Sequence, residues 1–301
     1  MDTGTAIAAG FFGQPPESLT EIMGLGSVNQ IFVAKLAGES IVVRLPQPQN
    51  REQAMAFYEK ERWCLEQAAR VGVPGPVVLK RGIHDGWPYQ VQSFVEGVNG
   101  KHSDLDPHVL MHTLGDYARR FHPLPLTGFG EMLSEFFSSD NHAGWQRFVA
   151  YNLASLTPDD ALMALGVYSA HQREAIHARF IALQEGAFTF GLCHGDLARR
   201  NTILAPDGTL FLLDWGSAEA HLIPHYDLMA LVGWYSPSDS RVHAFLDGYG
   251  WPLSERAALL AEVENLALLK SFDLVRWAID RCPTRITELA EKARVQAQSV
   301  A

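Results

Sequence analysis

Cysteine is scarce in this chain of 301 residues, and its spacing fits neither a disulfide framework nor a metal site. Cys64, Cys193 and Cys282 are far apart and odd in number. Free thiols of this kind are typical of a reducing compartment, so we expect a cytoplasmic protein. Cys193 is expected to be a small apolar filler rather than a nucleophile.

Basic residues are also in deficit. The chain has 24 Lys and Arg against 34 Asp and Glu, which gives a formal net charge of −10 at pH 7. Because no basic run interrupts this balance, the sequence excludes nucleic acids and anionic membranes as partners. An acidic protein is compatible with a cationic substrate, although net charge alone indicates little.

Long hydrophobic runs are absent as well. The run from Ala6 to Phe12 is too short to cross a bilayer, and residues 1–4 lack the positive charge that begins a signal peptide. Hydrophobic residues make up 47% of the chain and charged residues 19%. These proportions predict a soluble globular enzyme with a sizeable core.

The strongest chemical signal lies between residues 193 and 216. His194-Gly195-Asp196 is followed by Asn201, and Asp214-Trp215-Gly216 adds a second carboxylate. The stretches 202–204 and 209–213 predict two strands, joined by a turn at 205–208. Such a hairpin brings Asn201 and Asp214 to the same rim, with Asp196 on the loop that enters it.

This arrangement is typical of phosphoryl transfer from a nucleotide. One carboxylate orients and deprotonates a hydroxyl, while an amide and a second carboxylate hold Mg²⁺ on the phosphates. The spacing Asp-x-x-x-x-Asn, followed by Asp-aromatic-Gly, matches the catalytic loop and metal motif of kinase-like enzymes. The alternative is a surface loop with solvated acids, which would explain each residue alone but not all of them together.

These motifs resemble the aminoglycoside phosphotransferase family of small-molecule kinases. Protein kinases usually carry Arg and Phe where this chain has Gly195 and Trp215, which favours the small-molecule branch. The resemblance implies that Asp196 is the catalytic base and that Asn201 and Asp214 are metal ligands. It also implies that His194 braces the loop.

A glycine-rich hairpin is predicted near the start of the chain. Residues 17–45 predict a β-meander in which Gly24, Gly26, Ser27 and Asn29 occupy the first turn. Such a turn lets backbone N–H groups approach phosphates closely. Asn29 replaces a third glycine and can itself adopt positive φ. The pattern is weak alone, because Gly-x-Gly is usually only a turn, and it gains weight from the catalytic loop downstream.

The strand 41–45 carries Arg44 where a kinase-like fold places a phosphate-pairing Lys. Arg keeps the charge and binds phosphate bidentately, although its reach differs. The alternative is a strand-end Arg that pairs with a surface acid. A helix predicted over 51–71 offers the partners Glu59, Glu61 and Glu66, and the resemblance selects Glu61.

A hinge is implied by resemblance at Ser93, Phe94 and Val95, where backbone groups would bind an adenine edge. After it the composition turns helical. We therefore predict an N-lobe at residues 1–96 that binds nucleotide, and a C-lobe at 97–301 that holds the catalytic loop, the metal site and the substrate-binding helices.

Helices are predicted in the C-lobe over 108–122, 145–156, 158–185 and 228–234. His122, at the end of the first, has no metal-ligand companion and is expected to be a satisfied structural histidine. Asp227 is predicted to be the N-cap of the last. The resemblance also implies that Asp227 braces the catalytic loop.

Together these features predict an α+β, bilobal, protein-kinase-like fold: a small β-rich N-lobe with one main helix and a larger, mostly helical C-lobe. The predicted activity is transfer of the γ-phosphoryl group from ATP or GTP, with Mg²⁺, to a hydroxyl of a small molecule. Segments 127–130 and 145–148 resemble the hygromycin-phosphorylating branch, so an aminoglycoside or aminocyclitol antibiotic is the first choice of acceptor.

Two alternatives stay open. One is a metabolic kinase for choline, homoserine or a thio-sugar. The other is a non-catalytic nucleotide-binding regulatory protein, which the base Asp196 disfavours because binding alone would not require it. A cationic acceptor would be recognised by some of the acids after the metal motif, namely Glu219, Asp239, Asp247, Glu262, Glu264, Asp273 and Asp280. Oligomeric state cannot be predicted from this sequence.

Overall fold

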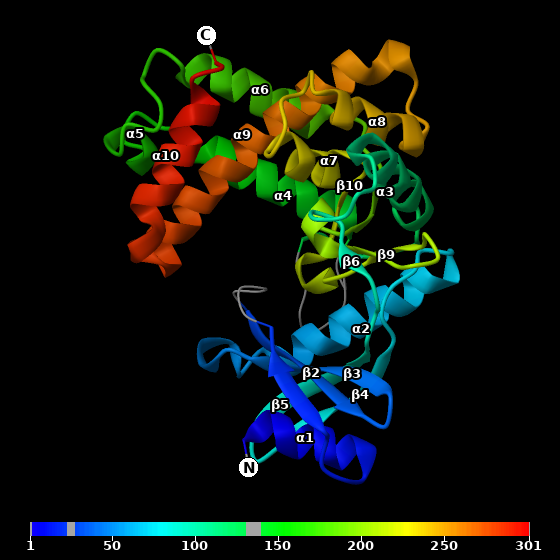
Figure 1. Cartoon of the computed structure of the whole chain (residues 1–301). Coiled ribbons are helices and arrows are strands. Elements are labelled where there is room, and N and C mark those ends of the chain that lie inside the picture. Colours follow the sequence, from blue (N-terminus) through cyan, green and yellow to red (C-terminus); the bar gives the residue numbers. More distant parts are fainter. Residues whose placement is uncertain (1, 23–27, 131–139, 301) are drawn as a thin grey trace.

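The computed structural model of the chain describes residues 2–22, 28–130 and 140–300. Figure 1 shows a sheet-rich lobe at the N-terminal end and a larger helical lobe at the C-terminal end. This confirms the α+β class and the two-lobed architecture. The boundary predicted after residue 96 falls between the last strand of the first lobe and the first strand of the second, and it stays a prediction.

The N-lobe is built on one antiparallel sheet with the strand order β1-β2-β3-β5-β4. The predicted meander is confirmed, and the predicted helix begins at Ala54 rather than Arg51 because residues 51–53 form a turn. The elements in chain order are α1 (Thr3–Phe12), β1 (Ser18–Glu21), β2 (Asn29–Leu36), β3 (Glu39–Pro46), the 3₁₀ turn η1 (Pro48–Asn50), α2 (Ala54–Arg70), β4 (Val78–His84) and β5 (Trp87–Ser93).

The N-terminal helix α1 was not predicted. Its short apolar sequence shows little amphipathic pattern, and its stability comes from packing rather than from its own propensity. Asp2 caps it by accepting a hydrogen bond of 2.9 Å from the Thr5 N–H. Ile7 and Ala8 are buried with Ile41 and other apolar residues of the sheet, so α1 closes the outer face of the N-lobe core.

The C-lobe is mainly helical. Its elements are β6 (Val98–Asn99), α3 (Pro107–Phe121), α4 (Asn141–Ala154), α5 (Ala161–Ala164), α6 (Arg173–Glu185), β7 (Phe190–Cys193), η2 (Arg199–Asn201), β8 (Thr202–Leu204), β9 (Leu210–Leu212), η3 (Trp215–Ser217), β10 (Glu219–Leu222), α7 (His225–Val232), α8 (Ser240–Tyr249), η4 (Leu253–Glu255), α9 (Arg256–Arg281), η5 (Pro283–Arg285) and α10 (Ile286–Ala297).

The predicted helices of the C-lobe are confirmed with two corrections. The stretch 158–185 holds only the short α5 and then α6, because Gly166 adopts a left-handed conformation with φ 66° and ends the first helix. The helix predicted from Leu228 is α7, which begins at His225. Asp227 therefore lies in its first turn and is not its N-cap.

The predicted hairpin around the motif residues is confirmed. Thr202 of β8 faces Leu212 of β9. The Leu213 N–H donates to the Asn201 carbonyl over 2.8 Å, so the strand end that carries Asp214 lies beside Asn201. Strands β7 and β10 form a second antiparallel pair, in which Cys193 faces Glu219. These two pairs place the catalytic loop between them.

The two lobes are joined through α2 and the segment after it. Cys64 and Leu65 of α2 belong to the same apolar cluster as Trp215 and the buried face of α3. The Lys60 ammonium donates to the Ala218 carbonyl over 3.1 Å, from a fully buried position. These contacts fix the N-lobe helix against the turn that follows the metal motif.

None of the helices in the described ranges is long and apolar enough to cross a membrane.

Helices α3 and α8 cross closely, and glycine makes this possible. A Cβ on Gly115 of α3 would lie 2.0 Å from the Phe245 carbonyl oxygen.

Gly115→Ala should therefore lower the free energy of unfolding by about 1–3 kcal/mol through overpacking. Gly10 occupies an exposed position of α1, where a Cβ would meet nothing within 4 Å. Gly10→Ala should therefore be neutral or stabilising by up to about 1 kcal/mol. Urea unfolding of both variants checks this, and equal effects would contradict it.

Candidate active site

The motif residues meet on the loop between β7 and β8. The Asn201 side-chain amide donates to the Asp196 Oδ2 over 2.9 Å and to the Asp196 carbonyl over 2.8 Å. Arg200 donates from Nη2 to the other carboxylate oxygen, Oδ1. The Asp196 side chain is still 32% exposed. The carboxylate is thus held in one orientation and remains open to a ligand.

His194 ties this loop to the strand that carries Asp214. Its Nε2 lies 2.9 Å from the Leu213 carbonyl, which can only accept, so Nε2 carries the proton. The Nδ1 then accepts from the Asp196 N–H over 3.3 Å. The ring also packs on Trp215, with 4.7 Å between centroids. The bracing function implied for His194 therefore has a physical basis in these contacts.

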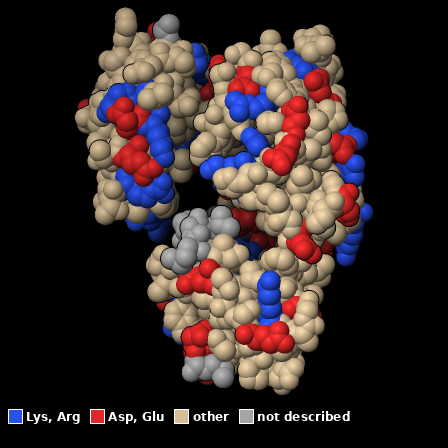
Figure 2. Space-filling view, in the orientation of Figure 1, with Lys and Arg blue, Asp and Glu red and all other residues tan. Residues whose placement is uncertain are grey.

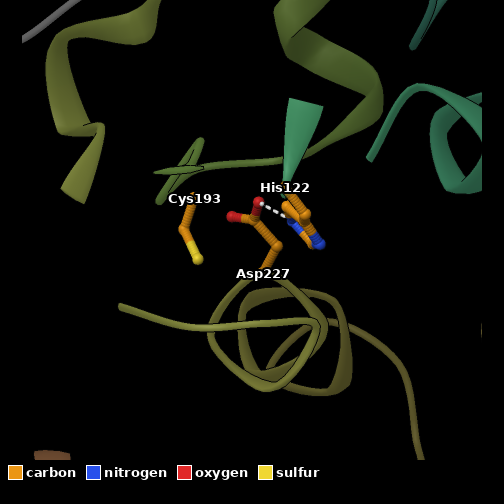
Figure 3. Close-up of side chains that lie close together, drawn as sticks. All are labelled: His122, Cys193 and Asp227. Carbon is orange, nitrogen blue, oxygen red and sulfur yellow. Dashed lines mark hydrogen bonds and ion pairs between the residues drawn. The ribbon is translucent and has the colours of Figure 1, made fainter. Parts of the chain in front are cut away.

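A buried carboxylate, Asp227, braces the loop from beneath (Figure 3). It accepts from the backbone N–H groups of His194 over 2.8 Å and Gly195 over 2.7 Å, and from His122 Nε2 over 3.0 Å. Burial alone would raise the pKa of Asp227, but the hydrogen bonds from His122 and the His194 backbone outweigh it and lower that pKa. His122, which also contacts the Tyr249 hydroxyl at 3.1 Å, is a satisfied structural histidine as predicted.

His122, Cys193 and Asp227 lie close enough together to suggest a metal site. Their hydrogen bonds do not fit one. Both Asp227 oxygens already accept from the protein, and burial raises the pKa of the Cys193 thiol, whose Sγ lies 3.7 Å from the Leu222 carbonyl. Because a metal ligand must be the thiolate, this cluster is a hydrogen-bonded brace, and Cys193 is the apolar filler predicted from sequence.

Gly195 explains why the loop cannot carry Arg between the His and the Asp. It adopts φ 77°, and a Cβ there would lie 2.0 Å from the Ser217 carbonyl oxygen. The turn after Asp214 therefore packs directly on the loop, an approach that only glycine allows.

Asn201 and Asp214 fit a magnesium ion by the chemistry of their free oxygens. The Asn201 amide nitrogen is used on Asp196, which leaves its Oδ1 as the ligand atom. Asp214 is 54% exposed and sits in the left-handed region at φ 60°. Such strain costs about 1–2 kcal/mol and is concentrated at functional sites. Oxygen ligands of this kind suit Mg²⁺.

Arg44 faces this pair from the N-lobe sheet. Its Nη1 donates to Glu61, as predicted, and its Nη2 lies 3.6 Å from Asp214 Oδ1. Burial alone would lower the pKa of Arg44, but the charges of Glu61 and Asp214 outweigh it and raise that pKa. Gln90 donates to the second Glu61 oxygen over 2.8 Å. Arg44 is therefore a buried cation whose hydrogen-bonded partner is the buried Glu61 rather than a surface acid.

Only some of the other residues predicted to bind the nucleotide lie in the described ranges. Gly24, Gly26 and Ser27 lie outside the described residues. Asn29 begins β2, without positive φ, and accepts from the Tyr58 hydroxyl over 2.9 Å. The Ser93 N–H already donates to the Val77 carbonyl over 2.8 Å. Phe94 and Val95 follow the end of β5 and are the hinge residues outside any strand.

Figure 2 shows a recess between the two lobes with both acidic and basic side chains at its walls.

Most of the acids proposed for cation recognition already have partners in the chain. The contacts are Glu219 with Lys270 at 3.9 Å, Asp239 with Arg241 at 2.6 Å, Asp247 with Arg256 at 2.6 Å, Glu262 with His225 at 2.8 Å and Asp273 with Asn152 at 3.3 Å.

Two residues beside the motif, Arg200 and Trp234, were missed by the sequence analysis. Arg200 pairs with Asp196 and stacks on Trp234, with 5.2 Å from Cζ to the ring centroid. The four-residue spacing from Asp196 to Arg200 indicates an ion pair only on a helix, and Asp196 lies in a loop, so this spacing does not signal the contact. Nothing in the sequence indicates Trp234, which is far along the chain.

Asp227→Asn tests the brace. The amide nitrogen would face a backbone N–H, so the variant should lose about 1–3 kcal/mol of unfolding free energy near neutral pH. Because the folded-state pKa of Asp227 is lowered, its stabilisation is present above the ordinary value near 4 and is lost as the pH falls through the folded-state value. The gap between the proteins should therefore narrow below about pH 4.

Urea unfolding over a pH series measures this gap. Asp104→Asn, at an exposed position before α3, is the control and should leave stability close to that of the wild type at every pH. A constant gap from neutral to acid pH would argue against the brace.

Comparisons with known proteins support the fold and assign the family. The structure is similar to the GDP complex of aminoglycoside 2′-phosphotransferase-IIIa, with a TM-score of 0.71, 16% identity and coverage of 98% of this chain and 97% of that one. It is similar to a thermostable mutant of aminoglycoside phosphotransferase APH(4)-Ia in a ternary complex with AMP-PNP and hygromycin B, with a TM-score of 0.68, 16% identity and coverage of 100% of this chain and 99% of that one. The structure is also similar to the GDP and kanamycin complex of APH(2")-IIia, with a TM-score of 0.68, 15% identity and coverage of 97% of each chain.

These likenesses confirm the kinase-like fold. A search of curated protein sequences found no match. The sequence profile of the phosphotransferase enzyme family matches residues 20–260, which is most of the chain. The chain therefore belongs to the phosphotransferase enzyme family, whose members phosphorylate hydroxyl groups.

Proposed function

We propose that this phosphotransferase moves the γ-phosphoryl group of ATP or GTP to a hydroxyl of a small molecule, with Asp196 as the base. One observation carries the proposal: the Asp196 carboxylate is fixed by Asn201 and Arg200 yet remains partly exposed. A base must be oriented and reachable by the hydroxyl proton. Asn201, which fixes it, is also a proposed metal ligand, so the base and the phosphate site are coupled.

The proposed reaction has one covalent step. The acceptor hydroxyl gives its proton to the Asp196 carboxylate, and its oxygen forms a bond to the γ-phosphorus. The bond from that phosphorus to the bridging oxygen breaks, and the nucleoside diphosphate leaves with the electron pair. Little covalent chemistry is left to the protein, so positioning and charge supply most of the catalysis.

Positive charge on the phosphates comes from two sources in this proposal. Arg44, buried and charged beside Glu61 and Asp214, supplies a fixed cation. Asn201 and Asp214 would hold Mg²⁺, which when bound neutralises phosphate oxygens. Backbone groups of Phe94 and Val95 are proposed for the adenine edge, and Gly24, Gly26 and Ser27 for the phosphates. The GDP and AMP-PNP complexes of proteins with this fold support a nucleotide donor.

The first candidate acceptor is an aminoglycoside or aminocyclitol. The similarity over almost the whole chain to aminoglycoside phosphotransferases, some in complexes with hygromycin B or kanamycin, supports it. The net charge of −10 favours a cationic acceptor.

A metabolic kinase for a small alcohol is the second candidate. The pairing of Asp239, Asp247 and three other acids within the chain favours a neutral acceptor of this class, such as a thio-sugar, because those carboxylates are not free to bind an ammonium group. Ionic strength separates a cationic acceptor, which includes choline as well as the aminoglycosides, from a neutral one. A cationic acceptor should show a KM that rises steeply with salt, since exposed charges are screened within about 10 Å at 0.1 M.

Asp196→Asn tests the base. We expect nearly unchanged nucleotide affinity and a turnover reduced by about 10²–10⁴, the contribution of general-base catalysis. The assay measures the rate of nucleoside diphosphate release in the presence of each acceptor of a panel: aminoglycosides, aminocyclitols, choline, homoserine and thio-sugars. Asp207→Asn is the control. Turnover near the wild-type value in Asp196→Asn would refute Asp196 as the base. Failure of the wild type to phosphorylate any hydroxyl would refute the proposed acceptor classes.

Asp214→Ala tests the metal site. Loss of one of two proposed ligands should abolish Mg²⁺-dependent nucleotide binding, measured by calorimetry with and without Mg²⁺. Asp207→Ala, which removes an exposed carboxylate from the same hairpin, should bind like the wild type. If Asp214→Ala kept the full effect of Mg²⁺ on affinity, Asp214 would have only a structural function.

A further inference from the structure

Arg200 makes an unusual set of contacts for a loop residue. Its Nη2 donates to Asp196 Oδ1, and its guanidinium lies over the Trp234 ring. Its backbone carbonyl accepts from the Asn99 side-chain amide over 2.7 Å. The main chain is thus anchored, while the guanidinium is held between the carboxylate of the proposed base and an aromatic face.

The side chain retains unused capacity for hydrogen bonds. A guanidinium has five N–H donors, and among the described residues only Nη2 of Arg200 has a hydrogen-bonded partner, Asp196. The side chain is 40% exposed. Its other N–H donors have no hydrogen-bonded partner among the described residues, and the planar fork of a guanidinium suits phosphate oxygens.

An ordinary surface ion pair would explain these contacts less well. Exposed ion pairs contribute little to stability and need no particular partner. Here the partner is the carboxylate that the reaction needs, and the aromatic surface is Trp234, which is 68% exposed. A large exposed tryptophan gains little from solvent, whereas a cation stacked on its face is attracted by the ring quadrupole.

The proposed reaction changes the charge on one side of this pair. When Asp196 takes the hydroxyl proton it becomes neutral, and its attraction for Arg200 falls. At the same time negative charge arrives with the phosphoryl group, on oxygens next to the accepting hydroxyl. The nearest cation with free donors among the described residues around Asp196 is Arg200.

We propose that Arg200 is a catalytic residue that passes its ion pair from Asp196 to the transferred phosphoryl group as the proton moves. Arg200 thereby supplies positive charge on the acceptor side, as Arg44 does on the nucleotide side. Trp234 is a positioning residue that keeps the guanidinium in place while it is unpaired. The inference rests on the proposed function, because it requires Asp196 to be the base.

The experiment compares Arg200→Ala and Arg200→Lys with a matched control, Arg241→Ala. Arg241 also pairs with an aspartate, Asp239, and also stacks on an aromatic ring, Tyr235, at 4.0 Å. Its side-chain partners among the described residues are Asp239 and Tyr235, and none of the motif residues is among them. We expect Arg200→Ala to lower kcat by about 10²–10³, the usual cost of one lost charge-stabilising donor. Nucleotide affinity should stay within about twofold, and Arg241→Ala should behave like the wild type.

Chemical rescue separates catalysis from folding. Millimolar guanidinium ion should restore part of the kcat of Arg200→Ala in a saturable way, and should not affect Arg241→Ala. Arg200→Lys should retain more activity than Arg200→Ala, because it keeps the charge but not the fork. Trp234→Leu should lower kcat less than Arg200→Ala.

Each other outcome overturns the inference. Full turnover of Arg200→Ala would show that no phosphoryl charge is stabilised there, and increased turnover would show that the pair with Asp196 is inhibitory. A loss that guanidinium does not restore would assign Arg200 a structural function. If Asp196→Asn is inactive while Arg200→Ala is active, the proposed function stands and only the inference fails. If the wild type transfers no phosphoryl group, both fail.

Discussion

The buried carboxylate of Asp227 is the contact on which the catalytic loop depends. Asp227 lies on α7 and accepts hydrogen bonds from two backbone N–H groups of the loop. It also accepts one from the ring of His122 at the end of α3. A carboxylate with several donors tolerates burial that would otherwise be costly. One side chain thus holds α3, α7 and the loop together, and it fixes the backbone of the two residues that precede Asp196.

From this brace the site extends by short links. His194 connects the loop to Leu213, and Asn201 connects Asp196 to the hairpin. Arg44 then reaches Asp214 from the other lobe. Because each link is a hydrogen bond or ion pair with one partner on the loop or hairpin, a shift of either lobe would change the position of the charges around the nucleotide. Lys60, which bonds the turn after Asp214, resists such a shift.

Charge in the site is divided between two arginines with different surroundings. Arg44 is buried, paired twice and close to the proposed metal ligands. Arg200 is half-exposed and paired with Asp196, the proposed base. A buried cation with fixed partners suits a bound polyphosphate, whereas an exposed one with free donors suits a group that arrives during the reaction.

The sequence by itself determined the local geometry of the candidate site. The spacing of Asp196, Asn201 and Asp214 predicted the loop and hairpin correctly, because strand period and turn residues act over a few positions. The Arg44–Glu61 pair was found only with the help of the family resemblance. The contact of Asp227 with the loop was likewise implied only by the resemblance. Tertiary structure alone decided that Asp227 lies in the first turn of α7, that α1 packs on the sheet, and that Trp234 contacts Arg200. Each of these depends on contacts between segments distant in the chain, whose burial and pairing local periodicity does not encode.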